Sequence, residues 1–224
     1  MNNITRFTCT CTLAFATLLL PGGARAQDYK YAAGWNAGGS YFTAMNAGAG
    51  SGSDITLDPG WIAGVQFESW TGSGRFGLRL NGALTERPLS LPGGDRSIGV
   101  WFADMDGLVR LLPAEPDRSF NLFVSVGAGL VQYRLGSGEQ LAFVPANAAY
   151  DGDNSVRFAA SGGLGADFIT GWSWDAQPVG IRIEVVDHVA FSSPFSPLAQ
   201  SGDFSPIHNA RFVIGVFSGF GLLR

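Results

Sequence analysis

The sequence predicts an all-β protein, an eight-stranded antiparallel up-and-down transmembrane β-barrel. Eight segments alternate apolar residues with small or polar ones, which is the period of a strand whose two faces meet different surroundings. No apolar run reaches the ~20 residues that a membrane-spanning helix needs. Long connections rich in Gly, Ser and Asp alternate with short ones, the asymmetry expected of a membrane barrel.

Residues 1–26 have the organisation of a secretory signal peptide. Arg6 precedes an apolar stretch, Leu13–Leu20, and small residues lead up to Ala26. A charged start, a short apolar core and a small-residue ending are the features that signal peptidase requires. We therefore expect cleavage after Ala26, and a single barrel domain over residues 27–224.

The composition argues against nucleic acid as a partner. Two of the 14 basic residues lie in the leader, whereas all 18 acidic residues follow it. Nucleic-acid binders carry basic patches, and none is visible. Both cysteines, Cys9 and Cys11, belong to the leader, which excludes disulfides and thiolate metal sites from the exported chain. We expect no cofactor.

Eight strands can be placed from the alternation. They cover residues 29–42, 56–69, 75–86, 97–112, 119–135, 155–170, 179–189 and 208–220. The long connections are predicted at 43–55, 87–96, 136–154 and 190–207, and the short ones at 70–74, 113–118 and 171–178. An even strand number places both chain ends on the side of the short turns, which is the periplasmic side in outer-membrane barrels.

The cost of charge in hydrocarbon decides which face of each strand meets lipid. In the third strand, for example, Leu78 and Leu80 alternate with Arg79 and Asn81. An arginine facing the middle of the bilayer costs ~2–4 kcal/mol. We predict that mid-strand charges all lie on the face that lines the lumen. Aromatic residues are predicted at the two membrane interfaces: Tyr41, Trp61 and Trp101 near the long connections, and Trp70, Trp172, Trp174 and Phe220 near the short ones.

The predicted lumen carries charges of both signs. Eight strands leave an interior only wide enough for side chains, and a buried ion needs a partner of opposite charge. The sequence therefore predicts a plug of salt bridges that closes the pore, with a narrow solute-selective channel as the alternative. The predicted network consists of Glu68, Arg79, Asp104, Asp106, Arg110, Asp167, Arg182, Glu184 and Arg211.

A lipid-modifying enzyme, an acyl hydrolase or transferase, is a second alternative. His188 follows Asp187, and Ser192 and Ser193 lie close by in sequence, with Glu184 nearby. A nucleophile must lie within hydrogen-bond reach of its base. No Gly-x-Ser-x-Gly motif accompanies these residues. We therefore predict no catalytic residues and treat the protein as a non-enzyme.

The order of several stretches resembles the small outer-membrane β-barrel proteins of the OmpA-like/OmpX-like group. These stretches are residues 104–113, 124–130, 181–187 and 208–209 leading into the last strand. The resemblance covers residues 27–224 and implies a barrel in a Gram-negative outer membrane, with structural, adhesive or stress-linked roles at the cell surface. Such barrels usually end on an aromatic residue that the assembly machinery recognises, whereas here Phe220 lies four residues inside the end.

A third alternative is a barrel in which the inner and outer faces of the strands are exchanged. A soluble lipocalin-like barrel would place the apolar faces inside, around a ligand, and alternation alone does not distinguish inside from outside. The low share of charged residues, 14% against roughly 25% in soluble domains, argues against it. The prediction is an integral outer-membrane barrel with a charge-plugged lumen, whose loops contact surface ligands. Its expected partners are outer-membrane lipid, lipopolysaccharide and the barrel assembly machinery.

Overall fold

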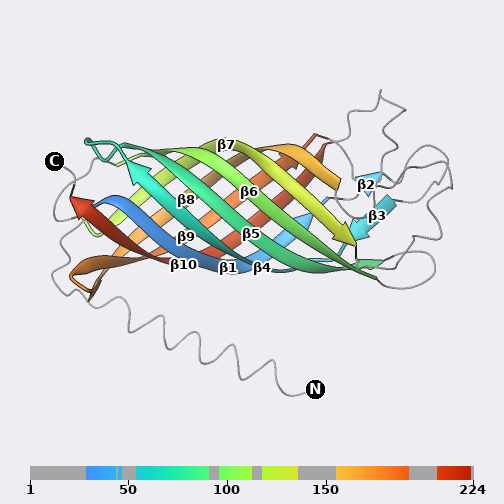
Figure 1. Ribbon diagram of the computed structural model, residues 1–224, viewed down its shortest axis with the longest axis horizontal. Coiled ribbons are helices and arrows are strands. Elements are labelled where there is room, and N and C mark those ends of the chain that lie inside the picture. The colour runs from blue at the N-terminus through green and yellow to red at the C-terminus, as the bar shows by residue number, and fades with distance from the viewer. Residues whose placement is uncertain are drawn as a thin grey trace, which may run out of the picture.

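Eight long antiparallel strands close into a barrel (Figure 1). The computed structural model describes residues 29–43, 45–46, 54–90, 96–112, 118–135, 155–191 and 206–222. The predicted signal peptide lies outside these residues. The barrel strands are β1 (Tyr29–Phe42), β4 (Gly60–Trp70), β5 (Phe76–Ser90), β6 (Arg96–Arg110), β7 (Phe120–Leu135), β8 (Ser155–Trp174), β9 (Gln177–Ala190) and β10 (Ile207–Leu222).

Every barrel strand has a hydrogen-bonded neighbour on both sides. The order runs β1, β4, β5, β6, β7, β8, β9 and β10, and β10 pairs back onto β1. Closure gives hydrogen-bond partners to the backbone N–H and C=O groups that an open sheet would leave unpaired at its two edges. None of the described residues forms a helix that could cross a membrane.

The two ends of the barrel differ. At one end, which we call the turn end, Tyr29 pairs with Leu222, so β1 begins where β10 finishes (Figure 1). The tight connections lie here too, including the turn over residues 71–75, in which Gly74 has a φ of 64°. At the other end, the loop end, two short strands extend the wall: β2 (Met45–Asn46) and β3 (Asp54–Leu57), with β3 paired to the end of β5.

The predicted strands agree with the observed ones, apart from one break and three connections. The long connection predicted at 43–55 contains β2 and the start of β3. The second predicted strand divides into β3 and β4 at Asp58 and Pro59, because proline has no N–H to donate to a neighbouring strand. The long connection predicted at 87–96 is wrong in extent, since β5 continues to Ser90 and β6 begins at Arg96. The loops predicted at 136–154 and over most of 190–207 lie outside the described residues.

The short connection predicted at 171–178 is also wrong. β8 continues to Trp174 and β9 begins at Gln177, so the turn consists of Asp175 and Ala176 alone. Both residues have positive φ, 51° and 62°, as a two-residue turn that matches strand twist requires. A shift in the β8–β9 register between Ile169 and Ser173 obscures the alternation in this stretch of sequence.

Glycines on the inner face make room for aromatic rings. Gly165 pairs with Phe123, and Gly180 pairs with Phe217. In each pair the ring lies across the neighbouring glycine, and a Cβ at that glycine would overlap the ring. Bulky inner side chains therefore fit into a narrow lumen because the facing strand carries only backbone at that point.

Candidate functional site

The lumen is filled by three successive layers of side chains. An apolar cluster occupies each end, and most of the charged residues lie between them. The turn-end cluster is Tyr29, Ala32, Trp70, Leu108, Phe123, Ile169 and Phe217. The loop-end cluster is Phe42, Leu57, Ile62, Ala83, Ile98, Val100, Phe102, Val131, Tyr133, Ala159, Ala190, Ile207 and Val213.

All nine residues of the predicted charge network lie in this lumen, none more than 6% exposed. The structure adds a tenth, Arg87, which is fully buried. The buried charged side chains of the described residues are therefore five arginines and five carboxylates, which removes the excess of acid that the sequence prediction left. Arg87 was missed because it falls in a segment predicted as a loop, although Thr85 and Arg87 continue the inward face of β5.

Arg182 joins two carboxylates from different strands. Its Nε lies 2.7 Å from Asp167 Oδ1 and its Nη2 lies 2.9 Å from Asp167 Oδ2, a bidentate pair between β9 and β8. The same guanidinium donates to both oxygens of Glu68 on β4, with 3.2 Å from Nη2 to Oε2. Bidentate pairs combine charge attraction with fixed geometry. Arg182 thus links β8 and β9 to β4 across the lumen.

Arg79 forms a second bridge. Its Nη2 lies 2.8 Å from Asp106 Oδ2 on β6, and its Nη1 lies 2.8 Å from Glu184 Oε2 on β9. Ser161 Oγ donates to the other oxygen of Asp106 at 2.5 Å. These contacts join the consecutive strands β5 and β6 to the consecutive strands β8 and β9, which lie far from them in sequence.

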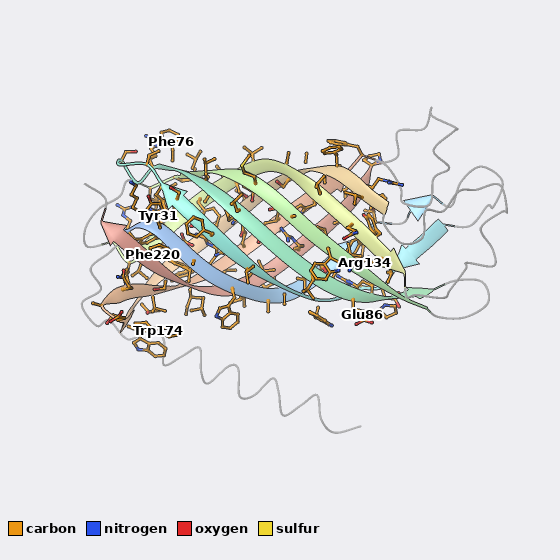
Figure 2. All side chains as sticks on the ribbon, viewed as in Figure 1. Tyr31, Phe76, Glu86, Arg134, Trp174 and Phe220 are labelled. Atoms are coloured by element: carbon orange, nitrogen blue, oxygen red, sulfur yellow. The ribbon has the colours of Figure 1, made fainter. Side chains whose placement is uncertain are left out.

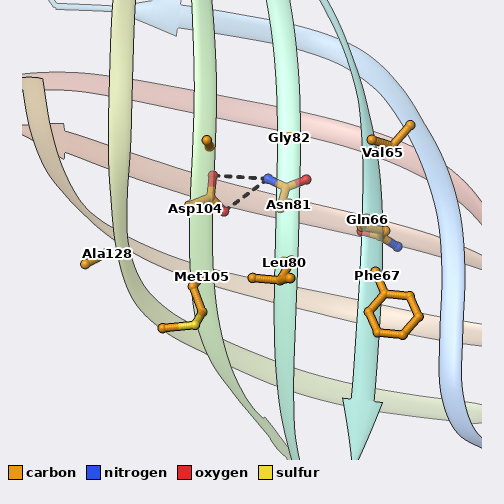
Figure 3. Close-up of a pocket in the computed structure, with 10 residues that line it drawn as sticks. Val65, Gln66, Phe67, Leu80, Asn81, Gly82, Asp104, Met105 and Ala128 are labelled. Carbon is orange, nitrogen blue, oxygen red and sulfur yellow. Dashed lines mark hydrogen bonds between the residues drawn. The ribbon is translucent and has the colours of Figure 1, made fainter. Parts of the chain in front are cut away.

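A third group surrounds Asp104, nearer the loop end. His188 Nε2 lies 2.8 Å from Asp104 Oδ2, and Arg211 Nη2 lies 3.8 Å from the same oxygen. The Nδ2 atom of Asn81 donates to both oxygens of Asp104 at 3.1 and 3.2 Å (Figure 3). His188 was not placed in the lumen network by the sequence prediction.

The two remaining arginines bind neutral groups at the ends of the lumen. Arg110, at the turn end, donates to Tyr29 Oη at 2.7 Å and to the Gly74 carbonyl at 3.1 Å, and stacks 3.7 Å from the centre of the Trp70 ring. Arg87, at the loop end, donates to the carbonyls of Asp58 and Ser40 at 2.6 and 2.7 Å. Among the described residues, no carboxylate lies within ion-pair distance of either.

The outer face of the wall is apolar. The prediction that the apolar residues of each strand point outward is confirmed. Trp35, Leu80 and Val126, for example, are 57–71% exposed although they lie in the middle of strands. Figure 2 shows side chains projecting from the whole circumference, with Tyr31, Phe76 and Phe220 at the turn end. A soluble barrel with apolar residues inside and charges outside, the lipocalin-like alternative, is the reverse of this arrangement.

The predicted interface aromatics lie on the outer wall, where Phe220 is half-buried against Tyr31 and Phe67, with one exception. Tyr41, Trp61 and Trp101 are 47–56% exposed towards the loop end. Trp172 and Trp174 are exposed near the β8–β9 turn. The prediction for Trp70 is wrong: this ring is 1% exposed and lies in the lumen, because it shares the inward face of β4 with Glu68. Its Nε1 donates to Glu68 Oε2 at 3.2 Å.

A shallow groove crosses the outer wall over β4, β5, β6 and β7 (Figure 3). Its volume is about 580 Å³. Small residues, Gly82, Ala103 and Ala128, lie between larger ones such as Phe67 and Met105. The groove lies in the middle of the apolar outer wall, and we assign it no separate function.

Among the residues considered for catalysis, those that the structure describes are not brought together. His188 points into the lumen, whereas Asp187, its neighbour in β9, points outward and contacts His208. Glu184 is engaged by Arg79. Ser192 and Ser193 lie outside the described residues. Successive residues of a strand face opposite sides, so proximity in sequence did not produce a shared site.

The outward position of Asp187 also corrects the prediction that mid-strand charges all face the lumen. Asp187 Oδ2 lies 2.6 Å from His208 Nδ1, and these side chains are 40% and 47% exposed on the outer wall. This polar pair therefore lies on an outer wall whose other described strand-centre residues are mostly apolar.

Comparison with models of known protein families gives no match, and comparison with curated proteins gives no significant match. Among solved structures, the chain is similar to the outer membrane protein OprG from Pseudomonas aeruginosa, with 12% identity, a TM-score of 0.47 and coverage of 89% of this chain and 98% of the other.

Two further structures share the likeness. The N-terminal β-barrel domain of Pseudomonas aeruginosa OprF gives 12% identity, a TM-score of 0.42 and coverage of 84% and 97%. The attachment invasion locus protein Ail of Yersinia pestis, solved with the heparin analogue sucrose octasulfate, gives 11% identity, a TM-score of 0.40 and coverage of 85% and 99%. The likeness concerns the fold, which follows here from the strand pairings of this chain.

Proposed function

We propose that this protein is an integral outer-membrane β-barrel of structural or surface-interaction type, with a closed lumen. Residues 1–26 serve as its signal peptide, and residues 27–224 form the barrel. The proposal rests on one observation: the barrel has apolar side chains on its outside and ion pairs on its inside, the reverse of a soluble protein. In water this arrangement would leave a continuous apolar surface exposed, and monomeric soluble proteins rarely expose large apolar patches.

The height of the apolar wall supports a bilayer as its surroundings. Tyr31 and Tyr41 both lie on the outward face of β1 and mark its two ends. Ten residues at about 3.3 Å each, along a strand inclined by about 40°, span about 25 Å of the barrel axis. This is the apolar height of outer-membrane barrels, which carry aromatic girdles at both edges.

The packing of the lumen argues for a structural barrel and against a channel. Apolar clusters lie on both sides of the charged middle layer, and the central arginines hold carboxylates from opposite strands. Eight-stranded barrels generally fill their interior with side chains, and aqueous channels need more strands. The loop end faces outward, and its segments contact lipopolysaccharide or surface ligands, while the barrel assembly machinery inserts the chain.

Heat modifiability tests this proposal. The protein should fractionate with the outer membrane, and after detergent extraction the unboiled form should migrate differently from the boiled form on a gel. Planar bilayers containing the folded protein should show no steady discrete conductance. Recovery of the exported chain in the detergent-free periplasmic fraction would contradict the membrane assignment, and steady openings would contradict the closed lumen.

A further inference from the structure

One polar pair lies on the lipid-facing side of the wall. Asp187 is flanked along β9 by apolar outward residues, with Val185 on one side and Val189 and Phe191 on the other. It therefore lies inside the apolar band and not at its edge. An ionisable group inside the membrane is costly and usually marks a functional site.

The geometry of the pair leaves it able to bind a ligand. Asp187 Oδ2 lies 2.6 Å from His208 Nδ1, which leaves Nε2 of the same ring without a partner among the described residues. The backbone of His208 is held by Thr43, whose Oγ1 accepts from His208 N at 3.0 Å and whose N donates to His208 O at 3.0 Å. The two side chains are 40% and 47% exposed, whereas Asp187 Oδ1 is buried without a hydrogen-bond partner, so a ligand from outside would meet Asp187 Oδ2 and His208 Nε2.

The wall provides space beside Asp187. In the strand pairing, Gly162 lies on one side of it and Ala210 on the other. A Cβ placed on Gly162 would meet no atom within 4 Å. A group that reaches Asp187 from the side therefore meets only small residues on the two adjacent strands.

We propose that the Asp187–His208 pair binds a lipid A-type glycolipid of the outer leaflet, through the amide and hydroxyl groups at the top of its acyl chains. This inference rests on the proposed function. Below headgroup level, a carboxylate needs hydrogen-bond donors, because an unpaired polar group in an apolar medium costs several kcal/mol. Amide N–H and hydroxyl groups are donors at that depth, and a hydroxyl can also donate to Nε2 of His208, because Nδ1 of that ring donates to Asp187.

Other occupants satisfy the pair less well. Glycerophospholipids carry only ester carbonyls at the top of their chains, and these accept hydrogen bonds without donating any. A second copy of the chain, docked by a twofold axis through Asp187, would set one Asp187 against another. The glycolipid is the occupant that supplies hydrogen-bond donors at the depth of the pair.

The test compares lipid-dependent stability in vesicles. The folded barrel is reconstituted in phosphatidylcholine alone, with phosphatidylglycerol, or with lipid A, and Tm is read from the loss of the heat-modifiable band. Lipid A should raise Tm of the unaltered protein more than phosphatidylglycerol does. Asp187→Val should abolish that additional increase, and His208→Phe should reduce it.

The controls separate the possible outcomes. Val185→Ala, at the adjacent lipid-facing position on β9, should keep the full response to lipid A. Valine at 187 suits an outward strand position, so Asp187→Val should fold in all three vesicles. An unchanged response of Asp187→Val, an equal effect of phosphatidylglycerol on the unaltered protein, or a change of oligomeric state in crosslinking would overturn the inference. Failure of every form to insert into vesicles would instead contradict the proposed function.

Discussion

Arg79 and Leu80 are neighbours in β5, yet Arg79 is 1% exposed and Leu80 is 57% exposed. The inner residue is surrounded by named partners, Asp106 and Glu184, at fixed distances. The outer residue has no comparable polar partner, and in the proposed membrane setting it contacts lipid. Substitutions on the two faces should therefore fail for different reasons, the inner ones through lost partners or lost space and the outer ones through contact with lipid.

The largest effect is expected at Arg182. Arg182→Met removes the cation from between Glu68 and Asp167 and leaves two buried carboxylates without it. Removing one partner of a buried ion pair costs about 3–5 kcal/mol. Urea unfolding of the barrel in vesicles should show this loss. Arg182→Lys, which keeps the charge but not the bidentate geometry, should lose less, and equal losses would contradict the role given to the guanidinium.

The next effect is expected on the outer face. Leu80→Arg places a cation against hydrocarbon and should destabilise the inserted barrel by about 2–4 kcal/mol. The yield of heat-modifiable protein in the outer membrane should fall accordingly. Asn81→Ala, one residue further along β5, should still insert, at a cost of about 1.5–3 kcal/mol for its bond to a charged group. Normal assembly of Leu80→Arg would refute the assigned facing.

A smaller loss is expected where an inner glycine accommodates a ring. Gly165→Ala would drive a methyl group into Phe123. Overpacking of this kind costs about 1–3 kcal/mol. The free energy of unfolding in urea measures it, and the double variant with Phe123→Leu should recover part of the loss. No recovery would mean that the ring is not the source of the strain.

The smallest effect, and one of opposite sign, is expected at Gly82 on the outer face. A Cβ there would meet only the Phe102 carbonyl oxygen, at 3.9 Å. Gly82→Ala should leave stability unchanged or raise it by about 0.4–1 kcal/mol, because it restricts the unfolded chain. The same urea experiment compares it with Gly165→Ala. A similar loss at both positions would remove the distinction between the two faces.

Much of the fold was accessible from local pattern. The alternation of Leu78, Arg79, Leu80 and Asn81 is visible over four residues, and the cost of charge in lipid assigns each face. Arg87 was missed because Pro88 and the nearby glycines suggested a loop, whereas a strand can include proline when its partner does not need the missing donor. Trp70 was misplaced because aromatic rings favour interfaces on average, although the alternation with Glu68 already indicated the lumen.

The sequence by itself determined the number of barrel strands, the two faces of each strand and nine of the ten buried charged residues of the described lumen, since a period of two is a local property of the chain. Only the tertiary structure decided which charges meet. Arg79 reaches Glu184, 105 residues away, and His188 binds Asp104 and not the adjacent Asp187. These partners depend on the register of successive strands and on closure between β1 and β10, which set how far each side chain lies along the barrel axis.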